Sequence, residues 1–156
     1  MIEYYVSMII SGIKMEPRDL IYSIPVIIFI SIASRIDLKI MKIPNKLNYT
    51  MILLRLALAV YIPIQASNIL GFVIGGALIL IPAMIVIKPM GGDIKFAAAL
   101  GLWIGDISIF LTMILAVVMF LFYGFKIKKI DVKESLPFAP FISIGYILII
   151  AIGLFI

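Results

Sequence analysis

The chain is 156 residues long, 65% hydrophobic and 13% charged, with a mean hydropathy of +1.28. Soluble domains carry about 45–50% apolar and about 25% charged residues, so this composition excludes the soluble class and predicts a membrane protein. The sequence has no histidine and no cysteine. This excludes Ser-His and Cys-His nucleophiles, histidine or thiolate metal sites, and disulfides. A net charge of +5 is typical of basic cytoplasmic loops in a membrane protein, and we expect no nucleic-acid partner.

The predicted elements are all helices, because only helices or closed barrels satisfy their backbone groups in lipid, and the apolar runs do not alternate as barrel strands do. At the start of the chain, apolar residues recur at helical spacing and predict a short helix at the membrane interface (Ile2, Tyr5, Val6, Ile9, Ile10, Ile13). Six longer apolar stretches then predict six transmembrane helices, at residues 20–34, 47–64, 69–87, 94–105, 107–125 and 138–156.

These elements predict an all-α polytopic membrane protein with one membrane-embedded domain over residues 1–156. Residues 1–19 form its N-terminal interfacial segment, and residues 20–156 form its six-helix core. Six spans place ten Lys and Arg side chains in three loops on one side, but only Lys14 and Arg18 on the other. Since basic loops stay in the cytoplasm, we expect a multi-pass protein of the cytoplasmic membrane with both termini outside.

Two aspartates stand at the predicted cytoplasmic boundary. Asp37 follows the first apolar stretch, and Asp93 opens the fourth one directly after Gly91 and Gly92. Two helices lie between them and return the chain to the same side. Two carboxylates that meet share one proton, so one can take a proton from water while the other polarises a peptide carbonyl. The spacing therefore allows an aspartyl dyad that faces the cytoplasm.

The same aspartates have simpler explanations. A carboxylate is favourable at a helix N-terminus, which accounts for Asp93 without catalysis. Asp37 could pair with Lys39 or Lys42. The spacing of the residues leaves both interpretations open.

The sequence around each aspartate resembles a known family. Residues 37–47, DLKIMKIPNKL, resemble the first motif of the type IV prepilin peptidases, in which Ile-Pro-Asn closely follows an Asp. Residues 91–101, GGDIKFAAALG, resemble their second motif, of the GxGD type, although Met90 stands where that motif has its first glycine. The resemblance covers residues 20–156, and the small archaeal prepilin and preflagellin peptidases are the most similar in kind.

The resemblance implies an intramembrane aspartyl endopeptidase with Asp37 and Asp93 as its catalytic residues. The motif residues that would shape the site are Gly91, Gly92, Pro44, Asn45 and Lys95. The implied substrates are prepilin-like or preflagellin-like precursors, cut between a short basic leader and a hydrophobic helix at the cytoplasmic face of the bilayer. No metal or organic cofactor is implied. Without the cysteine-bearing zinc region of the larger bacterial enzymes, N-methyltransferase activity is not expected.

Other residues carry weaker hypotheses. Asp131 and Glu134 are candidates for contact with the basic leader, although neighbouring lysines could pair with them. Arg55 lies within the second stretch, where either Asp106 or a water-filled crevice could compensate its charge.

The sequence also predicts structural roles for two motif residues and for two glycines. Asn45 is a possible helix cap, and Lys95 either favours ionisation of the dyad or reaches the headgroups. Gly71 and Gly75 predict close helix packing.

Two other functions stay open. A small ion or solute transporter or channel would use Arg55, Asp37 and Asp93 as intramembrane charges, but we find no internal repeat of the kind that many transporters have. A catalytically silent assembly subunit would have no need of both aspartates.

Overall fold

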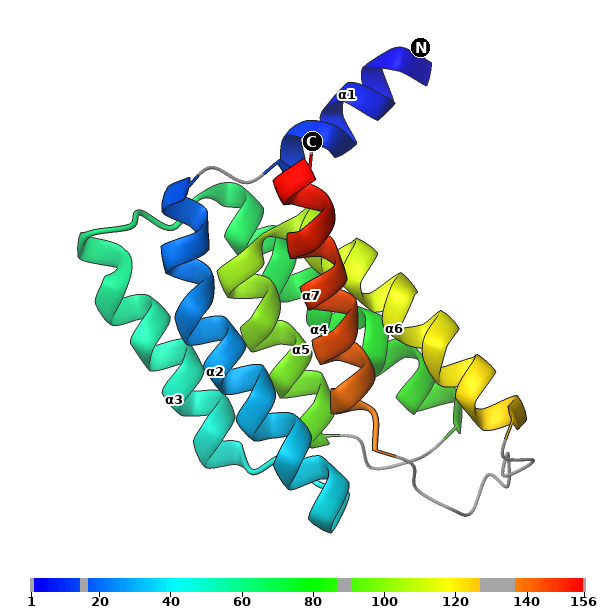
Figure 1. The fold of residues 1–156 in the computed structure, drawn as a ribbon. Coiled ribbons are helices and arrows are strands. Elements are labelled where there is room, and N and C mark those ends of the chain that lie inside the picture. Colours follow the sequence, from blue (N-terminus) through cyan, green and yellow to red (C-terminus); the bar gives the residue numbers. More distant parts are fainter. Residues whose placement is uncertain (1, 15–16, 87–90, 127–136, 156) are drawn as a thin grey trace.

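A computed structural model describes residues 2–14, 17–86, 91–126 and 137–155 (Figure 1). This part of the chain is helical and contains no strand. Its elements are α1 (Ile2–Ile13), α2 (Pro17–Ile40), α3 (Asn45–Ala57), the short 3-10 helix η1 (Leu58–Val60), α4 (Ala66–Val86), α5 (Gly91–Ile104), α6 (Asp106–Lys126) and α7 (Ala139–Phe155). The prediction of an all-α fold is confirmed for these residues.

By length and hydropathy, one described helix is able to cross a membrane. It is the Asp106–Gly124 part of α6, whereas the apolar segments Ile2–Ile13, Ala66–Ile81 and Ala139–Phe155 are shorter. The six-span arrangement therefore stays a prediction.

Helix α5 is the centre of the bundle (Figure 1). Its residues from Phe96 to Leu102 are all buried, and it packs against α3, α4 and α6. Three alanines and a glycine in this run let α4 come close. A Cβ added to Gly71 would collide with the Gly101 carbonyl, and one added to Gly75 with the Ala97 carbonyl. The predicted packing role of Gly71 and Gly75 is confirmed.

Several helix ends differ from the predicted stretches. α2 continues past Arg35 to Ile40, because a charged residue at the end of a helix can remain solvated without ending it. The stretch predicted at 47–64 is a shorter helix: α3 ends at Ala57, η1 follows, and the chain is non-helical before Pro63. A proline disfavours helical backbone in the preceding residue, which accounts for the non-helical backbone directly before Pro63.

Two residues with positive φ make tight turns between helices. Met41, with φ 52°, ends α2, and its N–H donates to the Asp37 carbonyl at 2.8 Å. Gly105, with φ 82°, separates α5 from α6, and its N–H donates to the Gly101 carbonyl at 2.9 Å. Glycine adopts this conformation without steric cost, so the second turn is the easier of the two to form.

Candidate active site

Asp37 lies in the last turn of α2 and is only 3% exposed. Its Oδ2 accepts a hydrogen bond of 2.9 Å from the backbone N–H of Ala139, the first residue of α7. In the described part of the chain no ion pair joins Asp37 to Lys39 or Lys42, whose side chains are exposed. The alternative of a simple surface pair is therefore wrong for these residues, and the carboxylate is instead held inside the bundle.

Asp93 lies in the first turn of α5 and is half-buried. Its carboxylate is close enough to that of Asp37 for a direct electrostatic interaction between them. Figure 1 shows why: α2 ends and α3, α5 and α7 begin at the same end of the bundle. The predicted return of the chain to one boundary thus brings the two aspartates together.

The two glycines before Asp93 have different surroundings. Gly92 lies against the loop that precedes α3, where an added Cβ would be 2.7 Å from the Ile43 carbonyl oxygen. Its own carbonyl accepts a hydrogen bond of 3.0 Å from Nδ2 of Asn48. Gly91 is exposed, and an added Cβ would meet no described atom within 4 Å. Of the two glycines, it is therefore Gly92 that fixes the position of the α5 start.

Asn45 and Lys95 connect the two motif segments. Nζ of Lys95 donates to Oδ1 of Asn45 at 3.0 Å and lies 5.7 Å from the centre of the Tyr49 ring. The prediction that Asn45 caps the helix is wrong: α3 begins at Asn45, Pro44 is the cap residue, and no side chain bonds the free N–H groups there. Pro44 has φ −69° and ψ 137°, the extended backbone that is typical of a residue directly before a helix.

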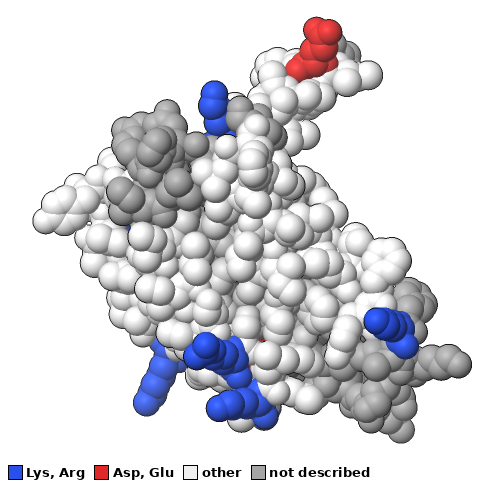
Figure 2. All heavy atoms as spheres, viewed as in Figure 1, with Lys and Arg blue, Asp and Glu red and all other residues white. Residues whose placement is uncertain are grey.

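Basic side chains gather at this same end of the bundle. Figure 2 shows Lys and Arg concentrated where α2 ends and α3 begins, with further basic side chains at the end of α6 and, at the other end of the bundle, near α1. By their positions in the helices, the basic residues at this end include Arg35, Lys39, Lys42, Lys46 and Lys95. The described residues contain no cluster of three or more acidic side chains that could hold a metal ion.

Some predicted residues lie elsewhere. Met90, Asp131 and Glu134 fall outside the described residues. Arg55 is 3% exposed at the opposite end of α3, where Ile62, Pro63 and Asn68 provide its hydrogen-bond acceptors. The prediction of Asp106 as its partner is therefore wrong: Asp106 starts α6, and its Oδ1 accepts from the N–H of Ile107.

Sequence reasoning missed two contributors to the site. Asn48 is fully buried and holds the Gly92 carbonyl, yet its own Oδ1 has no partner among the described residues. The available signal in the sequence was a second side-chain amide, that of Asn48, one turn after the Ile-Pro-Asn motif. Ala139 contributes only a backbone N–H, so its role leaves no trace in the identity of its side chain.

Comparison with curated proteins and with solved structures finds no match. One family model, that of the type IV leader peptidase family, matches residues 24–125, about two thirds of the chain. This range includes Asp37, Asp93 and the residues that connect them, and ends before α7. The match gives no support to the transporter hypothesis. The chain belongs to the type IV leader peptidase family.

Proposed function

We propose that this chain is an intramembrane aspartyl endopeptidase that removes the leader from prepilin-like or archaeal flagellin-like precursors. Membership of the type IV leader peptidase family supports a prepilin-type peptidase. The observation that carries the aspartyl mechanism is that Asp37 and Asp93 lie at the same end of the bundle, on two helices whose ends meet there, and influence each other electrostatically.

The chemistry needs two carboxylates that share one proton. The ionised one takes a proton from water as the water attacks the scissile carbonyl, and the protonated one donates to the carbonyl oxygen. An N–H can only donate, so Ala139 fixes Oδ2 of Asp37 as an acceptor and leaves Oδ1 for proton transfer. Asp93 is the more exposed of the two, and no described atom lies within 4 Å of a Cβ added to Gly91, which supports access for water and a peptide strand from this side.

The proposed topology places this site at the cytoplasmic face. The concentration of basic side chains at the same end supports that orientation. Six spans formed by one membrane-embedded domain over residues 1–156 would then leave both termini outside. The leader would lie in the cytoplasm with the hydrophobic helix of the precursor in the bilayer. Asp131 and Glu134 remain the proposed leader contacts, and peptidase activity is proposed without methyl transfer.

The test is a cleavage assay in detergent or lipid with precursors that carry a short basic leader before a hydrophobic segment. We expect Asp37→Asn and Asp93→Asn each to abolish cleavage and to remain folded. Asp106→Asn is the matched control, because it makes the same change at the first turn of α6, away from the pair. Cleavage by either dyad variant would disprove the mechanism, and an equal loss in Asp106→Asn would assign the effect to the fold.

A further inference from the structure

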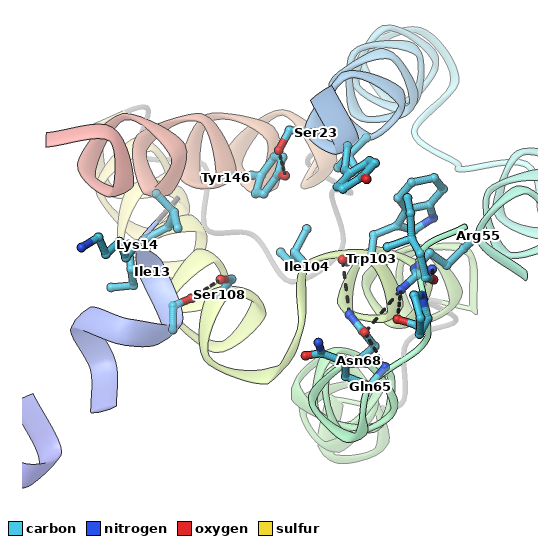
Figure 3. A pocket seen from close by; sticks show the side chains of 16 residues that line it. Ile13, Lys14, Ser23, Arg55, Gln65, Asn68, Trp103, Ile104, Ser108 and Tyr146 are labelled. Carbon is cyan, nitrogen blue, oxygen red and sulfur yellow. Dashed lines mark hydrogen bonds between the residues drawn. The ribbon is translucent and has the colours of Figure 1, made fainter. Parts of the chain in front are cut away.

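A second site lies at the end of the bundle opposite the two aspartates. A partly open cavity of about 230 Å³ is lined by the end of α1, the α3–α4 connection and parts of α2, α5, α6 and α7 (Figure 3). Its walls combine apolar side chains, including Val26, Ile104 and Ile149, with hydrogen-bonding groups from Asn68 and Ser108. The peptidase mechanism uses none of these residues.

Arg55 is a buried charged group in the wall of this cavity. Its guanidinium donates to the carbonyl oxygens of Ile62 and Pro63 at 2.9 and 3.5 Å, and to Oδ1 of Asn68 at 3.3 Å. A guanidinium has five N–H groups, so at least two have no acceptor among the described residues. The Trp103 ring lies 6.0 Å from its central carbon and closes one side.

Among the described residues, no acidic side chain lines the cavity to neutralise the charge of Arg55, and Lys14 adds a second cation. Figure 3 shows Lys14 and Arg55 on opposite sides of the lining. A buried cation is costly unless an anion or several dipoles compensate it, and here neutral oxygens do so only in part.

We propose that the Arg55 cavity binds an anionic phosphate group, carried by a phospholipid headgroup or present as free phosphate. Guanidinium N–H groups match phosphate oxygens in a forked geometry, and the amide and hydroxyl groups of the lining offer further hydrogen bonds. The volume exceeds what a carboxylate alone would fill. Apolar walls around a cationic centre suit the junction between a headgroup and its acyl chains.

Trp103 supplies a direct readout, since it is the chain's one tryptophan and lines the cavity. The detergent-solubilised protein is titrated in separate arms with dioleoyl phosphatidylglycerol, with dioleoyl phosphatidylcholine and with inorganic phosphate, while tryptophan emission is recorded. We expect a saturable change with the anionic lipid and at least tenfold weaker binding of the zwitterionic one. Saturation by inorganic phosphate at similar concentrations identifies free phosphate as the ligand. No saturable change with either anion, or equal binding of both lipids, overturns the proposal.

Variants locate the binding. Arg55→Gln should weaken anion binding at least tenfold, and Lys14→Gln should weaken it about threefold because its side chain is exposed. Arg35→Gln is the matched control, since it removes an exposed arginine at the other end of the bundle and should leave binding unchanged. Equal weakening in Arg35→Gln overturns the proposal. If Arg55→Gln does not fold, the proposal is still tested by the affinity of Lys14→Gln and by the lipid selectivity of the unaltered protein. Because binding is measured without cleavage, failure here is distinguishable from failure of the proposed peptidase activity.

Discussion

The backbone N–H of Ala139 and Oδ2 of Asp37 are 2.9 Å apart, which joins the first residue of α7 to the last turn of α2. Further along the same interface, Ser143 bonds Ser34 at 2.6 Å and donates to the Ile30 carbonyl at 3.1 Å. Helix α7 lies beyond the residues that the family model matches, yet it supplies the donor that holds one of the two aspartates. The position of Asp37 thus depends on α7 as well as on its own helix.

Removal of this single donor should impair catalysis and leave the fold in place. Ala139→Pro eliminates the N–H, and proline is tolerated at the first position of a helix. We expect the cleavage rate to fall at least tenfold, because Asp37 loses the bond that orients its carboxylate. The free energy of unfolding should fall by about 1–3 kcal/mol, because a buried acceptor is left without its donor. Steady-state cleavage and thermal unfolding in detergent measure the two effects.

Ala139→Gly is the control for this change, since it also alters the side chain but keeps the N–H. It should retain most of the activity. An unaltered rate in a folded Ala139→Pro protein would show that the contact does not orient Asp37.

The two glycines before Asp93 form a matched pair. Gly92→Ala places a Cβ 2.7 Å from the Ile43 carbonyl oxygen, so α5 or the loop before α3 must shift. The Cβ of Gly91→Ala meets no atom of the described residues within 4 Å. We expect Gly92→Ala to lower the cleavage rate at least tenfold, because a displacement of about 1 Å at a catalytic group can cost about 100-fold. Gly91→Ala should stay within about twofold of the unaltered protein, since alanine has the higher helix propensity. Equal rates in the two variants would contradict a positioning role for Gly92.

Much of the helical fold follows from the apolar stretches, since four of the six agree with a helix to within a few residues at each end. The two larger errors are the end of α2, which lies beyond the prediction, and the end of α3, which falls short of it. Charged residues such as Arg35 and Asp37 can lie in the last turns of a helix, so a charge does not mark its end. The left-handed backbone conformation of Met41 could not be predicted, because it is typical of glycine and uncommon in residues with a side chain such as that of methionine.

The candidate site was predictable where side-chain identity carries the signal. The two motifs pointed to Asp37 and Asp93, and the return of the chain explained their proximity. The contribution of Ala139 depends on a backbone group brought in from a distant helix, which no side-chain pattern encodes. Of the two alternatives for Arg55, Asp106 is wrong, because the acceptors of the guanidinium are mostly backbone carbonyls of the α3–α4 connection, which the sequence does not reveal.

Asn48 should matter more for activity than for overall stability. Asn48→Ala removes the hydrogen bond to the Gly92 carbonyl inside the protein, a change that costs about 1–3 kcal/mol in stability. Since Gly92 directly precedes Asp93, we expect the cleavage rate to fall at least tenfold even where the protein is fully folded. Thr50→Ala is the control on the same helix, because Thr50 is exposed and bonds only the carbonyl one turn back. A folded Asn48→Ala protein with the activity of Thr50→Ala would contradict the role assigned to Asn48.

The close packing of α4 on α5 predicts opposite outcomes for two adjacent glycines. A Cβ on Gly75 would collide with the Ala97 carbonyl, which belongs to the rigid centre of α5 and cannot move aside as a flexible side chain could. A Cβ on Gly76 would reach only the Ala98 side chain at 3.4 Å, an ordinary contact. We therefore expect Gly75→Ala to lower the free energy of unfolding by about 1–3 kcal/mol, the usual cost of overpacking. Gly76→Ala should change it by less than about 0.5 kcal/mol. Thermal unfolding followed by circular dichroism in detergent measures both, and equal stability of the two variants would show that α4 does not pack on α5 through Gly75.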